Sequence, residues 1–168
     1  MFIQPHYPGY LFSAPRSFAA LMEVYEDNYI ALRRLCPRLP EAGVMHVSHP
    51  AGIPRLYLRV LEHTRYTSSL GLTYRFLGED DGEVESPSLA VRVYHDARQA
   101  EVLFAPQGPA HTLSRHAYGL DDSASGALRM RWSANRFLNR WLHYCIAQGH
   151  AFTLAPDALA DTLADDRD

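Results

Sequence analysis

One short segment contains three residues of the types that catalyse proton transfer. His95, Asp96 and Glu101 lie around a predicted hairpin turn, and an imidazole beside carboxylates can act as a general base or bind a divalent metal. Neighbouring residues of a strand point to opposite faces, so His95 and Asp96 meet at one site only where the chain bends. Aspartate in a tight turn usually bonds to its own backbone. The three residues are candidates for catalysis, and turn structure is the simpler interpretation.

A polar cluster at residues 62–67 interrupts an otherwise apolar hairpin. Arg65 could supply a two-pronged guanidinium group for a phosphate or carboxylate, and Tyr66 a ring for stacking. Tyr94, next to His95, would extend the same ligand-facing rim. The alternative is a solvated hairpin tip with cross-strand contacts between threonine and tyrosine side chains.

No acidic residue occurs in the predicted C-terminal helix. Arg129, Arg136 and Arg140 share one side of it because they are spaced by seven and four residues. Residues 155–168 contain five aspartates and one arginine. We therefore expect the three arginines to bind an external anion in competition with this acidic tail, and a solvated basic face is the alternative.

Two helices and a set of strands must position these groups. Two segments alternate apolar and polar residues with the period of a half-buried strand, with Leu56, Leu58 and Val60 in one and Leu89, Val91 and Val93 in the other. Apolar stripes of helical spacing follow Ser17 and fill residues 127–148. The sequence predicts an α+β fold in which an N-terminal and a C-terminal helix pack on one face of an antiparallel sheet of about five strands.

The chain divides into an extended Pro/aromatic arm (1–16), a single α+β domain (17–150) and an acidic tail (151–168). The net charge of −3 includes −4 from residues 155–168, so the remainder is close to +1, and nucleic acid is an unlikely ligand. No apolar run is long enough to span a membrane. The absence of a secretory leader predicts a cytoplasmic protein, in which Cys36 and Cys145 are thiols.

Neither a metal nor a cofactor is expected. His46 and His49 form an H-x-x-H pair on a predicted strand, where side chains three residues apart diverge. The chain has no glycine-rich dinucleotide motif after a strand, no phosphate-binding loop and no nucleophile elbow. These absences exclude the enzyme classes that such motifs define.

Three patches carry a family resemblance: DNYIALRRLCPR in the first helix, EHTRYTS with VRVYHDARQAEV in the strands, and NRFLNRWLHYC in the second helix. Together they resemble the YqiB-like family, small bacterial proteins classed as a domain of unknown function. The likeness covers roughly residues 18–150. It implies no established activity, so no catalytic residue transfers to this chain.

The sequence favours a non-enzymatic cytosolic module, of binding or regulatory function, for a protein partner or an anionic metabolite. The alternative is a hydrolase of a phosphorylated or nucleotide-like small molecule that uses His95, Asp96 and Glu101 with Arg65. Homodimer formation is compatible with the sequence. We also expect Leu138 and Trp141 to be core residues.

Overall fold

The computed structural model describes residues 16–78, 82–103 and 124–153 of the chain. One helix precedes the strands and one follows them, which confirms the predicted α+β fold. The elements are α1 (Phe18–Leu35), β1 (Met45–Ser48), β2 (Leu56–His63), β3 (Thr67–Leu77), β4 (Glu83–Tyr94), β5 (Gln99–Val102) and α2 (Ala124–Ala147).

The five strands form one antiparallel sheet, and each strand pairs with its neighbours in sequence in the order β1-β2-β3-β4-β5. The alternation in the sequence matches an alternation in burial. Leu58 and Val60 of β2 are fully buried, whereas Arg59 between them is exposed. The register pairs Leu58 with Leu72 of β3, and Leu72 with Leu89 of β4, so that one apolar face runs across the sheet.

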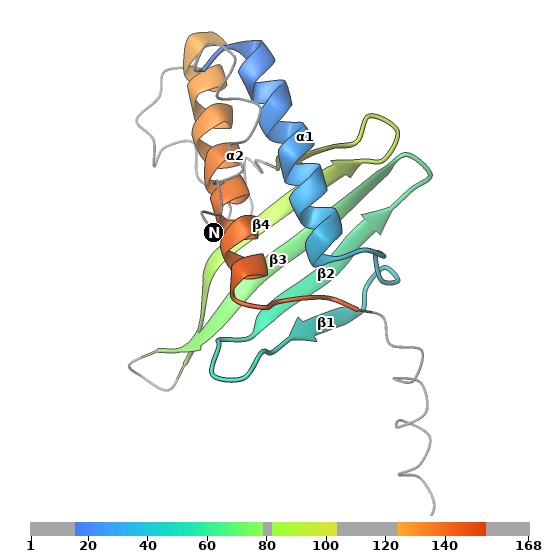
Figure 1. Ribbon diagram of the computed structural model, residues 1–168, viewed down its shortest axis with the longest axis vertical. Coiled ribbons are helices and arrows are strands. Elements are labelled where there is room, and N and C mark those ends of the chain that lie inside the picture. The colour runs from blue at the N-terminus through green and yellow to red at the C-terminus, as the bar shows by residue number, and fades with distance from the viewer. Residues whose placement is uncertain (1–15, 79–81, 104–123, 154–168) are drawn as a thin grey trace, which may run out of the picture.

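Both helices lie across this apolar face and run in the same direction (Figure 1). The Ser17 hydroxyl caps α1 by accepting a hydrogen bond from the Ala20 N–H at 3.1 Å. The helix ends before Pro37, which cannot continue it. Leu138 and Trp141 of α2 are 0% and 6% exposed within the main core. The predicted packing of two helices on one sheet face is confirmed.

One segment that its composition marks as a loop, residues 78–87, is partly a strand. β4 begins at Glu83 and pairs with β3 through this acidic stretch. The Nε of Arg75 lies 3.0 Å from Glu85 Oε1, and its Nη1 lies 3.6 Å from Glu83 Oε2. A cation on the neighbouring strand therefore offsets the poor strand propensity of these acids, and that pairing is not visible in local composition.

The packed domain continues beyond residue 150. Phe152 is 6% exposed, and its N–H donates to the Leu35 carbonyl at 2.8 Å. Residues 1–15 of the predicted arm and 154–168 of the predicted tail lie outside the described residues. In the described part of the chain, neither helix has the length and apolar composition needed to cross a bilayer.

Candidate functional site

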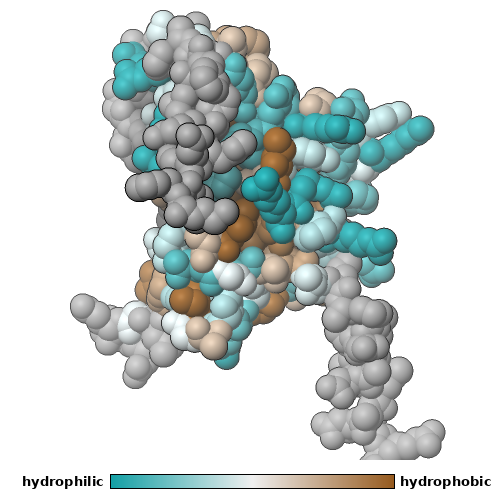
Figure 2. Space-filling view, viewed as in Figure 1, coloured by the Kyte–Doolittle hydropathy of each residue, from teal (hydrophilic) through white to brown (hydrophobic). Residues whose placement is uncertain are grey.

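A groove lies between the exposed side of α1 and the turn that joins β4 to β5. We call it the α1 groove. It has a volume of about 650 Å³ and is lined by Glu26, Tyr29, Ile30, Arg33, Arg34, Ala97 and Arg98. Ile30 is 50% exposed, which is high for a large aliphatic residue. On this side of α1, apolar surface lies between long hydrophilic side chains (Figure 2). The groove thus combines apolar contact area with cationic groups.

The charge of the α1 groove is positive, because three arginines face one glutamate. Within the described residues, none of Arg33, Arg34 and Arg98 forms an ion pair. Arg33 and Arg34 lie in the last turn of α1, where cations interact favourably with the helix dipole. The helix dipole explains these two arginines in part, but it does not explain Arg98.

Arg98 occupies a backbone position that favours glycine. Its φ is +53°, in the left-handed region, and it lies in the turn before β5. Glycine or asparagine is the usual residue in this conformation, because a Cβ atom crowds the following carbonyl oxygen there. An arginine at such a position works against the local backbone preference. The local backbone preference therefore does not explain why an arginine stands at this position.

Next to the groove, three side chains form a continuous hydrogen-bonded chain. Ser68 Oγ lies 2.7 Å from His63 Nδ1 and 2.7 Å from His95 Nε2. The Ser68 side chain is buried, with its residue 1% exposed. A hydroxyl group has one proton, so at least one of the two imidazoles must donate to Ser68 Oγ. The donor and acceptor roles of the two imidazoles at Ser68 are therefore linked.

The electrostatics of His95 connect this chain to the α1 groove. Burial lowers the pKa of His95 below its ordinary value, and the nearby charges of His63 and Arg33 lower it further. Asp96 acts in the opposite direction. At neutral pH His95 is consequently a neutral imidazole. An anion bound near Arg33 would favour its protonated form.

A second polar cluster surrounds Glu101 of β5. The Tyr94 hydroxyl donates to Glu101 Oε1 at 2.7 Å, and Arg131 Nη1 donates to Glu101 Oε2 at 3.0 Å. The Glu101 side chain is only 12% exposed. Burial and this carboxylate raise the pKa of Tyr25 and of Tyr94. Glu101 therefore accepts hydrogen bonds from both partners, an arrangement that stabilises structure.

The three candidates for catalysis divide between these clusters. His95 bonds to Ser68, whereas Glu101 bonds to Tyr94 and Arg131. Asp96 is exposed, and no side-chain hydrogen bond joins it to another described residue. The structure therefore brings His95 and Asp96 into electrostatic range but does not bring either one into contact with Glu101.

The residues of the predicted ligand-facing rim, Arg65, Tyr66 and Tyr94, also fall into two separate clusters. Arg65 and Tyr66 are exposed at the β2–β3 turn, with the guanidinium group 5.2 Å from the ring centroid. The His95 N–H donates to the Tyr66 carbonyl at 2.8 Å, which ties the two hairpin tips together. Tyr94 instead belongs with Glu101. Arg65 and Tyr66 thus lie near the histidines, and Tyr94 does not share their cluster.

The basic side of α2 is only partly solvated. Arg129 and Arg140 are exposed, and Arg136 is half-buried. An acid from another element reaches this helix, because Asp27 Oδ2 of α1 lies 3.3 Å from His143 Nε2. The acidic tail that we expect to compete for the three arginines lies outside the described residues.

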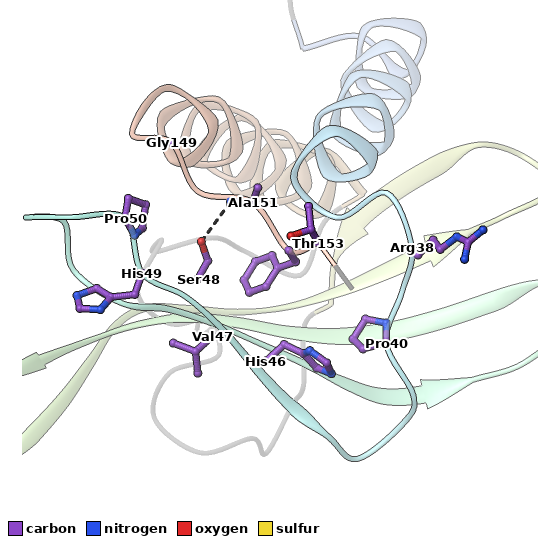
Figure 3. Close-up of a pocket in the computed structure, with 11 residues that line it drawn as sticks. Arg38, Pro40, His46, Val47, Ser48, His49, Pro50, Gly149, Ala151 and Thr153 are labelled. Carbon is purple, nitrogen blue, oxygen red and sulfur yellow. Dashed lines mark hydrogen bonds between the residues drawn. The ribbon is translucent and has the colours of Figure 1, made fainter. Parts of the chain in front are cut away.

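A smaller pocket of about 350 Å³ lies beside β1 (Figure 3). Arg38, His46 and His49 are among its lining residues, and the Ser48 hydroxyl accepts a hydrogen bond from the Ala151 N–H at 3.1 Å. His46 and His49 are directed apart (Figure 3). Among the described residues, no group of three or more His, Cys, Asp or Glu side chains could hold a metal ion.

Comparison with known families assigns the chain to a protein family. A family model described as "Protein of unknown function (DUF1249)" matches residues 31–151. The chain belongs to the DUF1249 family. The match spans the whole sheet and α2, and it includes Arg33, Arg34 and Arg98 of the α1 groove. The DUF1249 assignment carries no activity with it.

Curated relatives lead to the same family. The chain is 32% identical to the uncharacterized protein YqiB of Escherichia coli strain K12 over 132 residues, which cover 79% of this chain and 90% of YqiB. The YqiB proteins of strains O6:H1 and O157:H7 match equally well. No solved structure matches the chain significantly. The predicted resemblance to the YqiB-like family is confirmed.

Sequence reasoning missed the α1 groove. Arg33, Arg34 and Arg98 were not among the ligand-binding residues predicted from the sequence. Two signals were present in the chain. Ile30 falls outside the apolar stripe of its helix, and the turn HDARQ has no glycine or asparagine for a left-handed position. Neither signal indicates a binding site by itself, because the groove forms only where the fold places α1 against the β4–β5 turn.

Proposed function

We propose that this protein is a cytosolic binding module, without enzymatic activity, whose α1 groove takes an anionic metabolite with an apolar portion. The observation that carries the proposal is the convergence of Arg33, Arg34 and Arg98 beside Tyr29 and Ile30. The cytosolic location is supported by two buried free thiols, since the cytosol is reducing.

The lining chemistry favours a ligand of this kind. Guanidinium groups bind carboxylates and phosphates through paired N–H donors. Tyr29, Ile30 and Ala97 offer contact area to an apolar ring or chain next to the anion. Most small-molecule sites combine apolar walls with a few polar groups that fix the orientation of the ligand. A volume of about 650 Å³ lies within the range of about 300–1,000 Å³ that is typical of such sites.

Two contributions to affinity can be separated by the choice of probe. Inorganic phosphate tests the arginines alone, and phenyl phosphate adds a ring that can contact Ile30. Hydrogen bonds to charged groups contribute about 1.5–3 kcal/mol each when they are shielded from water and less at a surface. We therefore expect phenyl phosphate to bind more tightly than inorganic phosphate, with both affinities falling as salt is added.

Calorimetric titration of the full chain with both probes tests the proposal. Arg33→Ala should weaken phenyl phosphate binding about tenfold, whereas Arg59→Ala, an exposed arginine on β2, should leave it unchanged. Ile30→Ser should lower the affinity for phenyl phosphate and leave that for inorganic phosphate intact. Equal loss in the Arg33 and Arg59 variants would show that the binding is nonspecific, and it would remove the α1 groove as the site.

A second candidate function is a hydrolase of phosphorylated or nucleotide-like small molecules. The hydrogen-bonded chain of His63, Ser68 and His95 favours it, because a neutral imidazole near Arg33 could act as a general base. Phosphate release from phenyl phosphate distinguishes the two functions. Binding without turnover supports the module, and turnover that falls about 100-fold in His95→Ala supports the hydrolase.

A further inference from the structure

The two edge strands of the sheet differ in what covers their outer backbone. At β5, the Val102 N–H donates to Asn135 Oδ1 at 2.9 Å, and the Ala100 carbonyl accepts from Asn28 Nδ2 at 3.3 Å. Both asparagines are buried and come from the two helices. The helices therefore occupy the hydrogen-bonding positions that a further strand would need.

β1 has no such cover in the part of the chain that the structure describes. Its backbone pairs with β2, and no other backbone hydrogen bond among the described residues involves Met45–Ser48. β1 forms one edge of the sheet, and no described element lies beyond it (Figure 1). The unpaired N–H and C=O groups of an edge strand are a template for another strand. β1 is therefore competent to extend the sheet.

The side chains of β1 do not protect this edge either. Natural edge strands are commonly blunted by charged residues or proline. The segment of β4 that extends beyond β5 follows this rule with Glu83, Glu85 and Pro87. Residues 44–48 contain no formally charged side chain and no proline. Three large apolar residues there are 47%, 40% and 49% exposed, namely Val44, Met45 and Val47.

We propose that β1 pairs antiparallel with β1 of a second copy of this chain, around a two-fold axis at His46. This register places His46 opposite its symmetry mate and Met45 opposite Val47 of the other copy. Met45 and Val47 lie on the same face of the strand, and Val47 is directed away from the side of Ser48 (Figure 3). Apolar cross-strand pairs therefore form twice across the axis.

Because the β1 edge carries no formal charge, it can pair with the identical edge of a second copy. Two identical charged edges would repel each other, whereas identical uncharged ones do not. A two-fold contact uses the same patch on both copies and closes on itself, so it does not propagate into fibres. The five strands of each copy would then form one continuous sheet. Because so short a strand buries less than the roughly 1,200 Å² of a standard interface, the dimer should be weak, with a Kd of about 10–100 µM.

Sedimentation equilibrium of the full chain tests the pairing. The wild-type protein should dimerise with concentration, and Met45→Lys with Val47→Lys should raise the Kd at least tenfold. Both positions are exposed, so the double variant should keep the fold, and its thermal melt checks this. Val84→Lys is the matched control, because Val84 is 49% exposed like Val47 but lies on β4. It should dimerise like the wild type.

A cysteine at the axis tests the register. His46→Cys should form a disulfide-linked dimer under mild oxidation, since the two copies of residue 46 face each other, and Val84→Cys should not. The native Cys36 and Cys145 are buried and do not compete. A dimer that both lysines leave intact, or that the axial cysteine fails to link, would overturn the proposal. A monomeric wild-type protein would also overturn it, and the β1 edge would then be available to pair with a strand of a different protein.

Discussion

The two edges of the sheet are closed in different ways. The outer backbone of β5 is satisfied by Asn28 and Asn135, which are 72 and 33 residues away from their backbone partners. β1 has no comparable partners among the described residues, and its exposed side chains are apolar. In this fold, then, a strand edge is protected by side chains from distant elements, here those of α1 and α2. The side chains of β5 itself do not supply this protection.

The polar groups behind each edge also differ in chemistry. The β5 side uses two amides, which do not titrate. Behind β1, the buried His150 places its Nδ1 3.0 Å from Ser48 Oγ, and Ser48 also bonds the segment after α2. An imidazole changes charge in mild acid, whereas an amide does not. The two edges should therefore respond differently to pH as well as to mutation.

The largest effect on stability should come from a substitution in the core between α2 and the middle of the sheet, on which both edges depend. Trp141 of α2 is 6% exposed and contacts the ring of Tyr74 on the central strand β3. Trp141→Ala should lower the free energy of unfolding by about 3–5 kcal/mol, the usual cost of truncating a large buried aromatic. Urea unfolding measures it, and Trp141→Phe should cost less. A melting curve unchanged by Trp141→Ala would contradict the packing of α2 on the sheet.

The next largest effect should come from opening the β5 edge. Asn135→Ala removes the acceptor of the Val102 N–H and the donor to the Arg131 carbonyl. The Arg131 carbonyl keeps its bond within the helix, whereas the buried Val102 N–H is left without a partner, which costs about 1–3 kcal/mol, and we expect a loss of this size by urea unfolding. Ser133→Ala, at an exposed position of the same helix, is the control. Similar losses in both variants would mean that Asn135 acts through the helix and not through the edge.

The elements of this fold could be predicted because they rest on local periodicity. Alternation in β2 and β4 and the apolar stripe of α1 are properties of short windows. The start of β4 was missed because Glu83 and Glu85 are tolerated through Arg75 on another strand. The fold class and the packing face follow from pattern alone, whereas a strand boundary set by an ion pair does not.

The candidate site was harder to predict for the same reason. His95 and Glu101 are close in sequence, and strand alternation had been an argument only against His95 and Asp96 sharing a site. Their separation follows from partners that no local pattern reveals, namely Ser68 on one side and Arg131 on the other. The α1 groove joins residues about 65 positions apart, from Arg33 to Arg98, and spacing alone cannot identify such a pair.

The pH dependence of stability should distinguish the two edges further. Burial lowers the pKa of His150 below its ordinary value of 6.5. The unfolded chain therefore binds a proton at higher pH than the folded one, and the free energy of unfolding falls as pH drops below about 6.5, until the folded pKa is reached. Urea unfolding of wild type and His150→Gln at about pH 7.5 and pH 5.5 measures this.

The sensitivity to acid should be smaller in His150→Gln than in the wild type. The pKa of His95 is also lowered, so His95→Gln is the matched control that separates the two histidines. Hydrogen exchange should place the acid-induced opening near β1 and leave Ala100 and Val102 protected. Equal loosening of both edges in acid would contradict the assignment to His150.

The smallest expected effect on stability concerns the turns next to each edge. Gly43 and Gly52, on either side of β1, have φ values of +87° and +74°, whereas the turn before β5 has Arg98 at +53°. A non-glycine residue in this region costs about 1–2 kcal/mol, and glycine costs about 0.5–1 kcal/mol in chain entropy. Arg98→Gly should therefore raise the free energy of unfolding by about 0–1 kcal/mol.

The same substitution removes one of three guanidinium groups from the α1 groove. We expect the affinity for phenyl phosphate to fall about tenfold while the protein becomes no less stable. Arg98→Lys separates the two effects, because it keeps the charge and the left-handed strain but loses the paired donors. If Arg98 serves only the turn, Arg98→Gly will change stability alone and leave the calorimetric titration as it is in the wild type. A gain in stability together with a loss of binding would show that backbone strain is retained at this turn for the sake of the arginine side chain.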